Sequence, residues 1–395
     1  MTSSLLQRLG IALPIIQGPM TGSDTPALAA AVSAAGGLGM LGCGMRSPAA
    51  MAEAAAAVRQ QTDRPFGMNL FVQATPNPDE ATAQAAMERL APLYAELGLQ
   101  PQRPAQWCED FAAQFEALLA LRPAVASFTF GILTAAQVAR LQAVGSTVIG
   151  TATTLAEAQA WAAVGADAVC ASGMEAGGHR GTFLTPTQPG ATGAAPSLAD
   201  FAASMVGTLP LVAQCAQALS IPVIAAGGIM DGRGIAGALA LGAQAVQMGT
   251  AFLACPESGI GPAYRQALAQ AQDTDTRLTR VFSGRPARGI VNAMMEALAA
   301  EEDRVPAYPV QNALTGALRR TAATQGRTSH LSLWAGQGVG AARPVPAARL
   351  MALLAREWRL AAASVAAKAI CRGGLADSRS DADVPQLLCA HSPTK

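Results

Sequence analysis

The chain has 395 residues, of which 51% are hydrophobic and 13% are charged, and its formal net charge at pH 7 is +1. The length allows one large domain or two, and a charge near zero gives no indication of a nucleic acid or an anionic membrane as a partner. The longest uncharged stretches, 25–45 and 206–230, are interrupted by Gly and Pro, so we interpret each as a buried helix next to a buried strand and expect no membrane span.

Short apolar runs alternate with helical patterns along most of the chain. The runs occupy 14–20, 39–42, 66–72, 124–130, 147–150, 168–171, 222–226 and 245–248, and helical patterns follow at 25–35, 48–60, 135–144, 155–164, 205–219 and 234–241. Continuous apolar runs are typical of parallel strands covered on both faces. Eight such strands favour an α/β fold closed into a (β/α)8 TIM barrel. The alternative, an open doubly wound sheet, would be expected to begin with a Gly-x-Gly-x-x-Gly fingerprint, which is missing here.

Other segments depart from this alternation and suggest a division into domains. We expect a barrel over 1–252, with a helical insertion at about 74–121 that contains helices 80–97 and 108–121. Residues 253–340 are interpreted as a smaller, mainly helical domain inserted after the eighth strand. A C-terminal helix over 341–360 would close the barrel domain, and the polar tail 361–395 is expected to be partly disordered.

In TIM barrels the active site lies on the loops at the carboxyl ends of the strands. Gly227 and Gly228 follow the predicted seventh strand, and Gly249 and Thr250 follow the eighth. Paired glycines let backbone N–H groups approach an oxyanion, and these two loops form the recurrent phosphate site of the fold. The interpretation is a phosphate-bearing cofactor or substrate. Tight strand-to-helix turns alone would also explain the glycines.

The predicted sixth strand is followed by a glycine-rich loop, Ser172 to Gly181, that contains His179. A histidine on a loop at the mouth of a barrel can accept or donate a proton near neutral pH. We therefore expect His179 to be catalytic, whereas His330 and His391 lie outside the barrel and are interpreted as structural or surface residues. Glu175, in the same loop, would either orient the imidazole or be solvated.

Four further side chains are candidates with two interpretations each. Met20, after the first strand, is either a wall for a planar ring or ordinary packing at the barrel end. Asn69, within the third strand, needs a polar partner, which is either a cofactor edge or neighbouring backbone. Arg285 and Arg288 would bind an anion or pair with backbone carbonyls.

The seven cysteines are widely spaced without any Cys-x-x-Cys, and the chain has three histidines in all. We expect neither a metal site nor a disulfide framework. The start of the chain lacks the pattern of a secretory signal, so a cytoplasmic location is expected.

Several of these segments together resemble the nitronate monooxygenase family, formerly called 2-nitropropane dioxygenases. They are 14–20, 69–71, 175–179, 225–229 and 247–250, and the resemblance covers about residues 10–357. The segments 308–315 and 333–337 look like the bacterial, class I branch of that family.

The resemblance implies non-covalently bound FMN and an oxidative denitrification. Alkyl nitronates, such as propionate 3-nitronate, would react with oxygen to give a carbonyl compound and nitrite, and His179 would be the catalytic residue. The FMN contacts implied are Asn69, Ser172, Gly177, Gly228, Gln247, Met248, Gly249 and Thr250, and Met20 is added as a candidate wall of the cofactor site. Position 172 is usually Gln in the family, so a shorter side chain stands here. The partners would be an anionic nitronate and oxygen, in a monomer or homodimer.

Two other functions compete with this one. The first is an FMN-dependent NAD(P)H reductase of quinones or of enoyl-acyl carrier protein on the same scaffold. The second is a non-catalytic barrel that binds a phosphorylated ligand.

Overall fold

Eight parallel strands form one sheet in the computed structural model of the chain, which describes residues 4–184 and 197–376. In chain order they are β1 (Ile15–Gln17), β2 (Gly39–Gly42), β3 (Phe66–Phe71), β4 (Val125–Thr129), β5 (Thr147–Ala152), β6 (Ala168–Ser172), β8 (Val223–Ala226) and β9 (Ala245–Met248). Their order in the sheet is β1-β9-β8-β6-β5-β4-β3-β2. A parallel bridge between Ile16 and Leu38 links β1 to the residue before β2 and closes the ring. The predicted TIM barrel is therefore confirmed.

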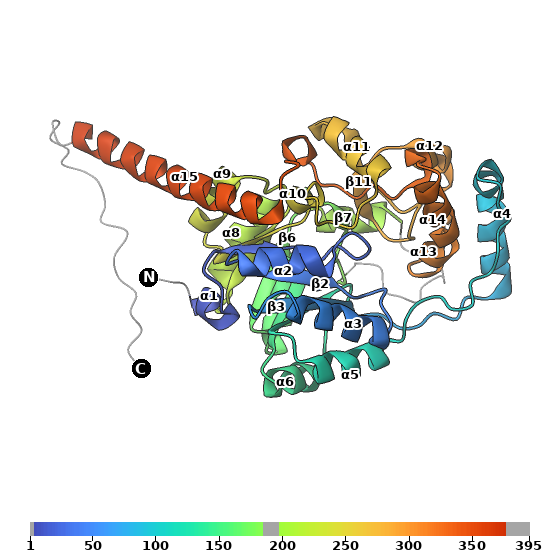
Figure 1. Ribbon diagram of the computed structural model, residues 1–395, viewed down its shortest axis with the longest axis horizontal. Coiled ribbons are helices and arrows are strands. Elements are labelled where there is room, and N and C mark those ends of the chain that lie inside the picture. The colour runs from blue at the N-terminus through green and yellow to red at the C-terminus, as the bar shows by residue number, and fades with distance from the viewer. Residues whose placement is uncertain (1–3, 185–196, 377–395) are drawn as a thin grey trace.

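A layer of helices surrounds the barrel, as the alternation predicts (Figure 1). These helices are α2 (Pro26–Ala34), α3 (Pro48–Arg59), α5 (Phe111–Leu121), α6 (Ala135–Ala143), α7 (Leu155–Ala163), α8 (Thr208–Ala218) and α9 (Gly232–Ala240). Thr25 and Ser47 cap α2 and α3 by accepting from backbone amides, each with Pro as the next residue. Gly145, Gly165 and Gly242 have positive φ just after helices, where residues with a side chain would be strained.

The barrel interior is sealed at its amino-terminal end by α1 (Ser4–Leu9). Leu5, Leu6 and Leu9 pack against strand residues such as Val125 and Ile224 in one buried cluster. Because this end is filled by apolar side chains, a ligand site can open only at the carboxyl ends of the strands.

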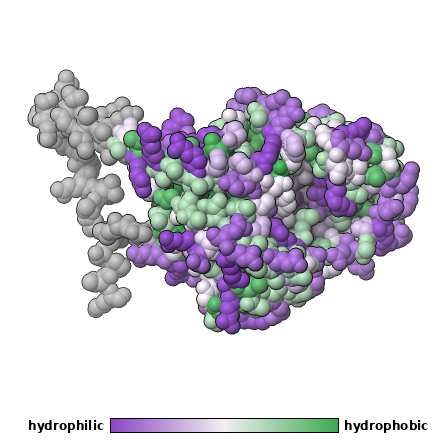
Figure 2. Space-filling view, viewed as in Figure 1, coloured by the Kyte–Doolittle hydropathy of each residue, from purple (hydrophilic) through white to green (hydrophobic). Residues whose placement is uncertain are grey.

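A second hydrophobic core lies beside the carboxyl ends of the strands and is built mainly from the C-terminal half of the chain. Its helices are α4 (Glu80–Glu96), α10 (Thr250–Leu253), α11 (Pro262–Gln270), α12 (Ala293–Ala297), α13 (Val310–Leu314) and α14 (Gly316–Thr324). The two helices of the predicted 74–121 insertion belong to different cores. Leu90 and Leu93 of α4 pack in this second core, whereas Phe115 and Leu118 of α5 pack against the barrel. Hydrophilic residues cover α4 at the edge of the molecule (Figure 2).

A small antiparallel sheet joins the barrel to the second core. It consists of β10 (Thr276–Thr279), β11 (Ala287–Ile290) and β7 (Gly178–His179), in the order β10-β11-β7. The mainly helical region 253–340 thus also contains strands. His179, expected on a loop, instead lies in the two-residue strand β7, with Ala287 as its register partner. A strand of two residues is too short to show a hydrophobic period. Its pairing partner also lies about 100 positions away, so no local pattern predicts the strand.

The last helix, α15 (Ala347–Ala376), extends past the expected end of the C-terminal helix at residue 360. Leu350 and Leu354 pack in the barrel core, and Glu357 accepts a hydrogen bond from the backbone N–H of Gly232 in α9. Figure 1 shows α15 projecting away from the barrel at its C-terminal end. The rest of the expected tail, 377–395, lies outside the described residues. Among the described helices, none has the length and apolar character that a membrane span requires.

We expect Gly150→Ala to destabilise the barrel. A Cβ at this position in β5 would lie 2.0 Å from the ring of Trp161, which is completely buried. Overpacking of this kind costs about 1–3 kcal/mol. In the matched control, Gly237→Ala in α9, the added Cβ meets no atom within 4 Å, and a gain of about 0.5–1 kcal/mol is expected in a helix. Urea unfolding midpoints measure both changes, and equal midpoints for the two variants would contradict the packing argument.

Candidate active site

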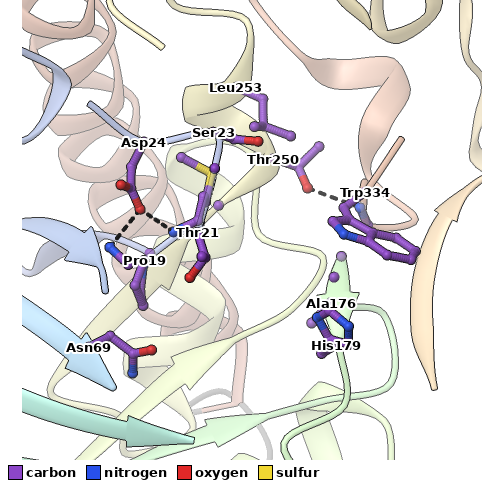
Figure 3. A pocket seen from close by; sticks show the side chains of 18 of the residues that line it. Pro19, Thr21, Ser23, Asp24, Asn69, Ala176, His179, Thr250, Leu253 and Trp334 are labelled. Atoms are coloured by element: carbon purple, nitrogen blue, oxygen red, sulfur yellow. Dashed lines mark hydrogen bonds between the residues drawn. The ribbon is translucent and has the colours of Figure 1, made fainter. Parts of the chain in front are cut away.

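A cavity of about 730 Å³ opens at the carboxyl ends of the strands, between the barrel and the second core. This volume lies within the range of small-molecule and cofactor sites. The ten residues singled out from the sequence all line it: Met20, Asn69, Ser172, Gly177, His179, Gly228, Gln247, Met248, Gly249 and Thr250. Figure 3 shows Asn69 and His179 on different sides of the space, with Trp334 next to the imidazole. The structure places these residues together, and their roles remain predictions.

The imidazole of His179 is held by a residue from the C-terminal half of the chain. Its Nε2 lies 2.9 Å from Oγ of Ser283. The Ser283 hydroxyl in turn donates to the backbone oxygen of Arg285, at 3.1 Å. A hydroxyl has one proton to donate, so in this arrangement Nε2–H donates to Ser283 and Nδ1 carries the lone pair. The basic atom of the ring is then Nδ1.

The surroundings of His179 favour the neutral imidazole. Burial lowers the pKa of His179 to about 3, and the positive charges of Arg285 and Arg319 contribute to this lowering. Three aromatic rings surround it, with centroids 5.4 Å away for Phe130, 5.6 Å for Tyr308 and 5.3 Å for Trp334. A neutral imidazole in an apolar frame can accept a proton or a hydrogen bond without first losing one.

Glu175 makes no hydrogen bond to the imidazole, so the interpretation that it orients the ring is wrong, and its half-buried carboxylate binds Thr208 instead. Its carboxylate accepts from the backbone N–H and the hydroxyl of Thr208, at 2.9 and 2.7 Å. This contact ties the loop after β6 to the start of α8. The positioning of the imidazole falls to Ser283, because β7 turns His179 toward β11.

Arg285 and Arg288 pair with backbone carbonyls, which is the second of the two interpretations given for them. Arg285 donates to the backbone oxygens of Arg180 and Thr182, and its guanidinium lies 4.2 Å from the centre of the Phe130 ring. Arg288 donates to the backbone oxygen of Met174, at 3.0 Å. Both cations therefore bind backbone carbonyls of the β6–β7 region.

Asn69 finds its partners on the next strand rather than on a backbone group. Its Nδ2 donates to Ser127 Oγ at 2.9 Å and to Thr129 Oγ1 at 3.3 Å, both on β4. The amide is thereby fixed with its nitrogen toward β4. Met20 packs against the barrel core and the second core, as ordinary packing predicts. It also lines the cavity, and its role as a wall for a planar ring stays a prediction.

The glycine loops after β8 and β9 face the same cavity. Gly227 and Gly228 have φ values of 112° and 70°, a region that glycine enters without strain. The first turn of α9 is already occupied, because the Asp231 side chain accepts from the amides of Arg233 and Gly234. An anion at this end of the cavity would therefore meet the loops rather than the helix terminus.

Three of the remaining predicted cofactor contacts differ in which of their groups is available to a ligand. Thr250 Oγ1 accepts from the N–H of Gly336 at 3.0 Å, which leaves its own proton to donate (Figure 3). The side chain of Met248 packs in the barrel core, so only its backbone is available to a ligand. Ser172 donates no hydrogen bond within the described residues, and its backbone oxygen accepts from Arg180.

Sequence reasoning missed the aromatic frame and one cation. Phe130 follows β4 with a φ of 79°, a strained value for a residue with a side chain. Tyr308 and Trp334 lie in segments noted only for their resemblance, and Arg319 of α14 was not considered. Only Phe130 had a signal in the sequence, which is its position at the end of a strand. Tyr308, Arg319 and Trp334 come from the C-terminal half of the chain, outside the barrel strands.

Comparisons with known proteins agree on one family. The family model described as nitronate monooxygenase matches residues 2–357. The chain is 45% identical to the nitronate monooxygenase of Pseudomonas aeruginosa over 91% of this chain and all of that protein. Among solved structures, nitroalkane oxidase from Streptomyces ansochromogenes matches with 40% identity and a TM-score of 0.82, over 92% of this chain and all of the other. FabK from Thermotoga maritima matches with 29% identity and a TM-score of 0.70, over 93% and 99%.

We expect His179 to stay neutral from pH 8 to pH 5, with its proton on Nε2. The cause is its lowered pKa together with the hydrogen bond to Ser283. Nitrogen-15 NMR of histidine-labelled protein measures both the tautomer and the titration, and His179→Gln identifies the resonances. An ordinary titration of His179 near pH 6.5 would overturn this description of the site.

Proposed function

The chain belongs to the nitronate monooxygenase family of flavin-dependent oxidoreductases, and we propose that it uses FMN and oxygen to convert alkyl nitronates into a carbonyl compound and nitrite. Propionate 3-nitronate is an example of such a substrate. The net reaction replaces the C=N bond of the nitronate by C=O. Half an oxygen molecule per nitronate balances its atoms and charge, so no external reductant is required.

The observation that carries the proposal is the neutral His179 imidazole at the wall of a large cavity that is also lined by Arg319, a cation without a carboxylate partner among the described residues. Arg285 and Arg319 both act on His179 electrostatically. Neither forms an ion pair with a carboxylate in the described part of the chain. A site with this excess of positive charge favours an anionic substrate such as a nitronate. His179 would then hydrogen-bond the nitronate or take the α-proton of a neutral nitroalkane.

The cavity fits a flavin phosphate in its glycine content. A Cβ at Gly227 would lie 2.7 Å from Thr208 Oγ1, and one at Gly177 would lie 2.5 Å from the N–H nitrogen of Gly336. Packing therefore requires glycine at these two positions. The bare backbones of Gly228 and Gly249 line the cavity, and their N–H groups can approach an anion closely. Gly228, Gly249 and Thr250 would hold the phosphate.

The other predicted contacts would meet the rest of the cofactor. These are Met20, Asn69, Ser172, Gly177, Gln247 and the backbone of Met248. When bound, FMN would accept electrons from the nitronate and deliver them to oxygen. The protein's own part is to bind and orient the nitronate beside His179 and to keep its imidazole neutral.

Two alternatives were left open by the sequence. Membership of an oxidoreductase family leaves the non-catalytic barrel without support. The reductase alternative is left to experiment, because none of the relatives reported above is named as a reductase.

We expect His179→Ala to retain flavin and to lose nitronate turnover by about 100-fold or more, since general acid–base groups contribute about 10²–10⁴-fold. Nitrite release from propionate 3-nitronate measures turnover, and the flavin absorbance per protein measures cofactor content. Mass spectrometry of the flavin released on denaturation identifies it as FMN or as another flavin. Ser283→Ala keeps the imidazole but removes its hydrogen-bond partner. Its nitronate turnover should therefore lie between those of the wild-type protein and His179→Ala. Unchanged turnover in His179→Ala would rule out the assignment.

A second experiment separates the monooxygenase from the reductase. Purified enzyme is mixed anaerobically with NADH or NADPH, and the flavin absorbance is followed. We expect no rapid bleaching, because the proposed reaction needs no external reductant. Rapid bleaching by either nucleotide would favour the reductase instead.

A further inference from the structure

Two arginines line the cavity, and they differ in how their charge is balanced. Arg46 forms an ion pair with the buried Asp24, with 3.3 Å between Nη2 and Oδ1. Arg319, on α14, has no carboxylate partner within the described residues. A cation that is largely withdrawn from water without a counter-ion is costly, so its presence at a cavity wall indicates an anionic ligand.

The guanidinium of Arg319 is oriented by the chain that precedes it. Its Nη2 donates to the backbone oxygen of Asn312 at 2.7 Å and to Oδ1 of the same residue at 2.8 Å. Its Nε donates to the backbone oxygen of Thr315 at 3.4 Å. These contacts involve Nε and Nη2, and Nη1 donates to no group in the described residues.

Two more donors accompany Nη1 on this wall. The Tyr308 hydroxyl interacts electrostatically with Arg319 and makes no hydrogen bond among the described residues. Nδ2 of Asn312 has only the sulfur of Met45 near it, at 3.9 Å, and a thioether is a weak acceptor. This end of the cavity therefore offers three donors, while the backbone oxygen and Oδ1 of Asn312 are already bound to Arg319. Such a set matches a carboxylate.

The donor set lies beside the proposed reaction centre but not at it. The Tyr308 ring centre is 5.6 Å from that of His179, and the same residue interacts with Arg319 through its hydroxyl. Tyr308 is thus a neighbour of the imidazole, and Arg319 acts electrostatically on both residues. A nitronate beside His179 would direct a short tail toward Arg319.

We propose that Arg319, with Tyr308 and Asn312, is the specificity determinant that binds a carboxylate on the tail of the nitronate substrate. This inference rests on the proposed function, because it takes the nitronate group to lie at His179. The enzyme then prefers nitronates with a second, anionic group over nitronates with an uncharged tail of the same length. A neutral tail would leave the guanidinium and the hydroxyl without partners in a desolvated site.

The test compares two substrates that differ only in the tail. Propionate 3-nitronate ends in a carboxylate, and propyl-1-nitronate has a methyl group in its place. We expect Arg319→Met to lower the ratio of their kcat/KM values by about 10- to 100-fold, the usual size of a hydrogen bond to a charged group. Because the ratio is taken within one preparation, it is independent of the fraction of folded protein.

Two further variants serve as controls. Arg320→Met removes the exposed neighbouring charge on α14 and should keep the wild-type ratio. Arg319→Lys keeps a cation without the planar fork and should give an intermediate ratio. An equal loss for both substrates in Arg319→Met would place Arg319 at the nitronate group itself or in packing, and would overturn the tail assignment. An unchanged ratio would overturn it as well.

A binding measurement tests the same site without turnover. Succinate has the chain length of propionate 3-nitronate with a carboxylate at each end, and butyrate has a single carboxylate. Calorimetry should show tighter binding of succinate than of butyrate to wild-type protein, and this preference should disappear in Arg319→Met. If wild-type protein binds both equally, the proposal is wrong. If succinate is preferred but no nitronate is turned over, the proposed function fails while the carboxylate site stands.

Discussion

The pairing of β7 with β11 is the interaction on which the candidate site depends. It is only two residues long, with Gly178 and His179 opposite Arg288 and Ala287. It joins a loop of the barrel to a segment of the second core about 100 residues later in the chain. The pairing also brings Ser283 within 2.9 Å of the imidazole.

Buried arginines reinforce this junction, and the nearby carboxylates of Glu157 and Glu175 balance part of their charge. Arg180, Arg285 and Arg288 donate mainly to backbone carbonyls around the junction. Carbonyls satisfy the N–H groups of a guanidinium but do not neutralise it. Burial lowers the pKa of His179, and the positive charges of Arg285 and Arg319 contribute to this lowering. In the proposed function, the same region that fixes the imidazole would favour an anionic substrate.

The barrel explains why so much of the cavity lining could be predicted. In a closed parallel sheet every strand ends at the same rim, so residues that follow strands are brought together whatever their distance in sequence. Met20, Gly228 and Thr250 follow this rule, and Asn69 lies within β3 near its carboxyl end. The amino-terminal rim is filled by α1, which leaves one end open to a ligand. What each side chain touches is a separate matter, and Glu175 illustrates this, since its partner proved to be Thr208.

The sequence by itself determined the barrel, the order of its strands and the loop that contains His179, because these follow from local periodicity and glycine placement. The resemblance of short motifs also indicated the family. Only the tertiary structure decided that His179 lies in a strand, that Ser283 holds it, and that Tyr308 and Arg319 complete the cavity. Those contacts join residues more than 100 positions apart through a second core. No local pattern encodes which distant backbone a two-residue strand will pair with, since that choice depends on how the two cores pack.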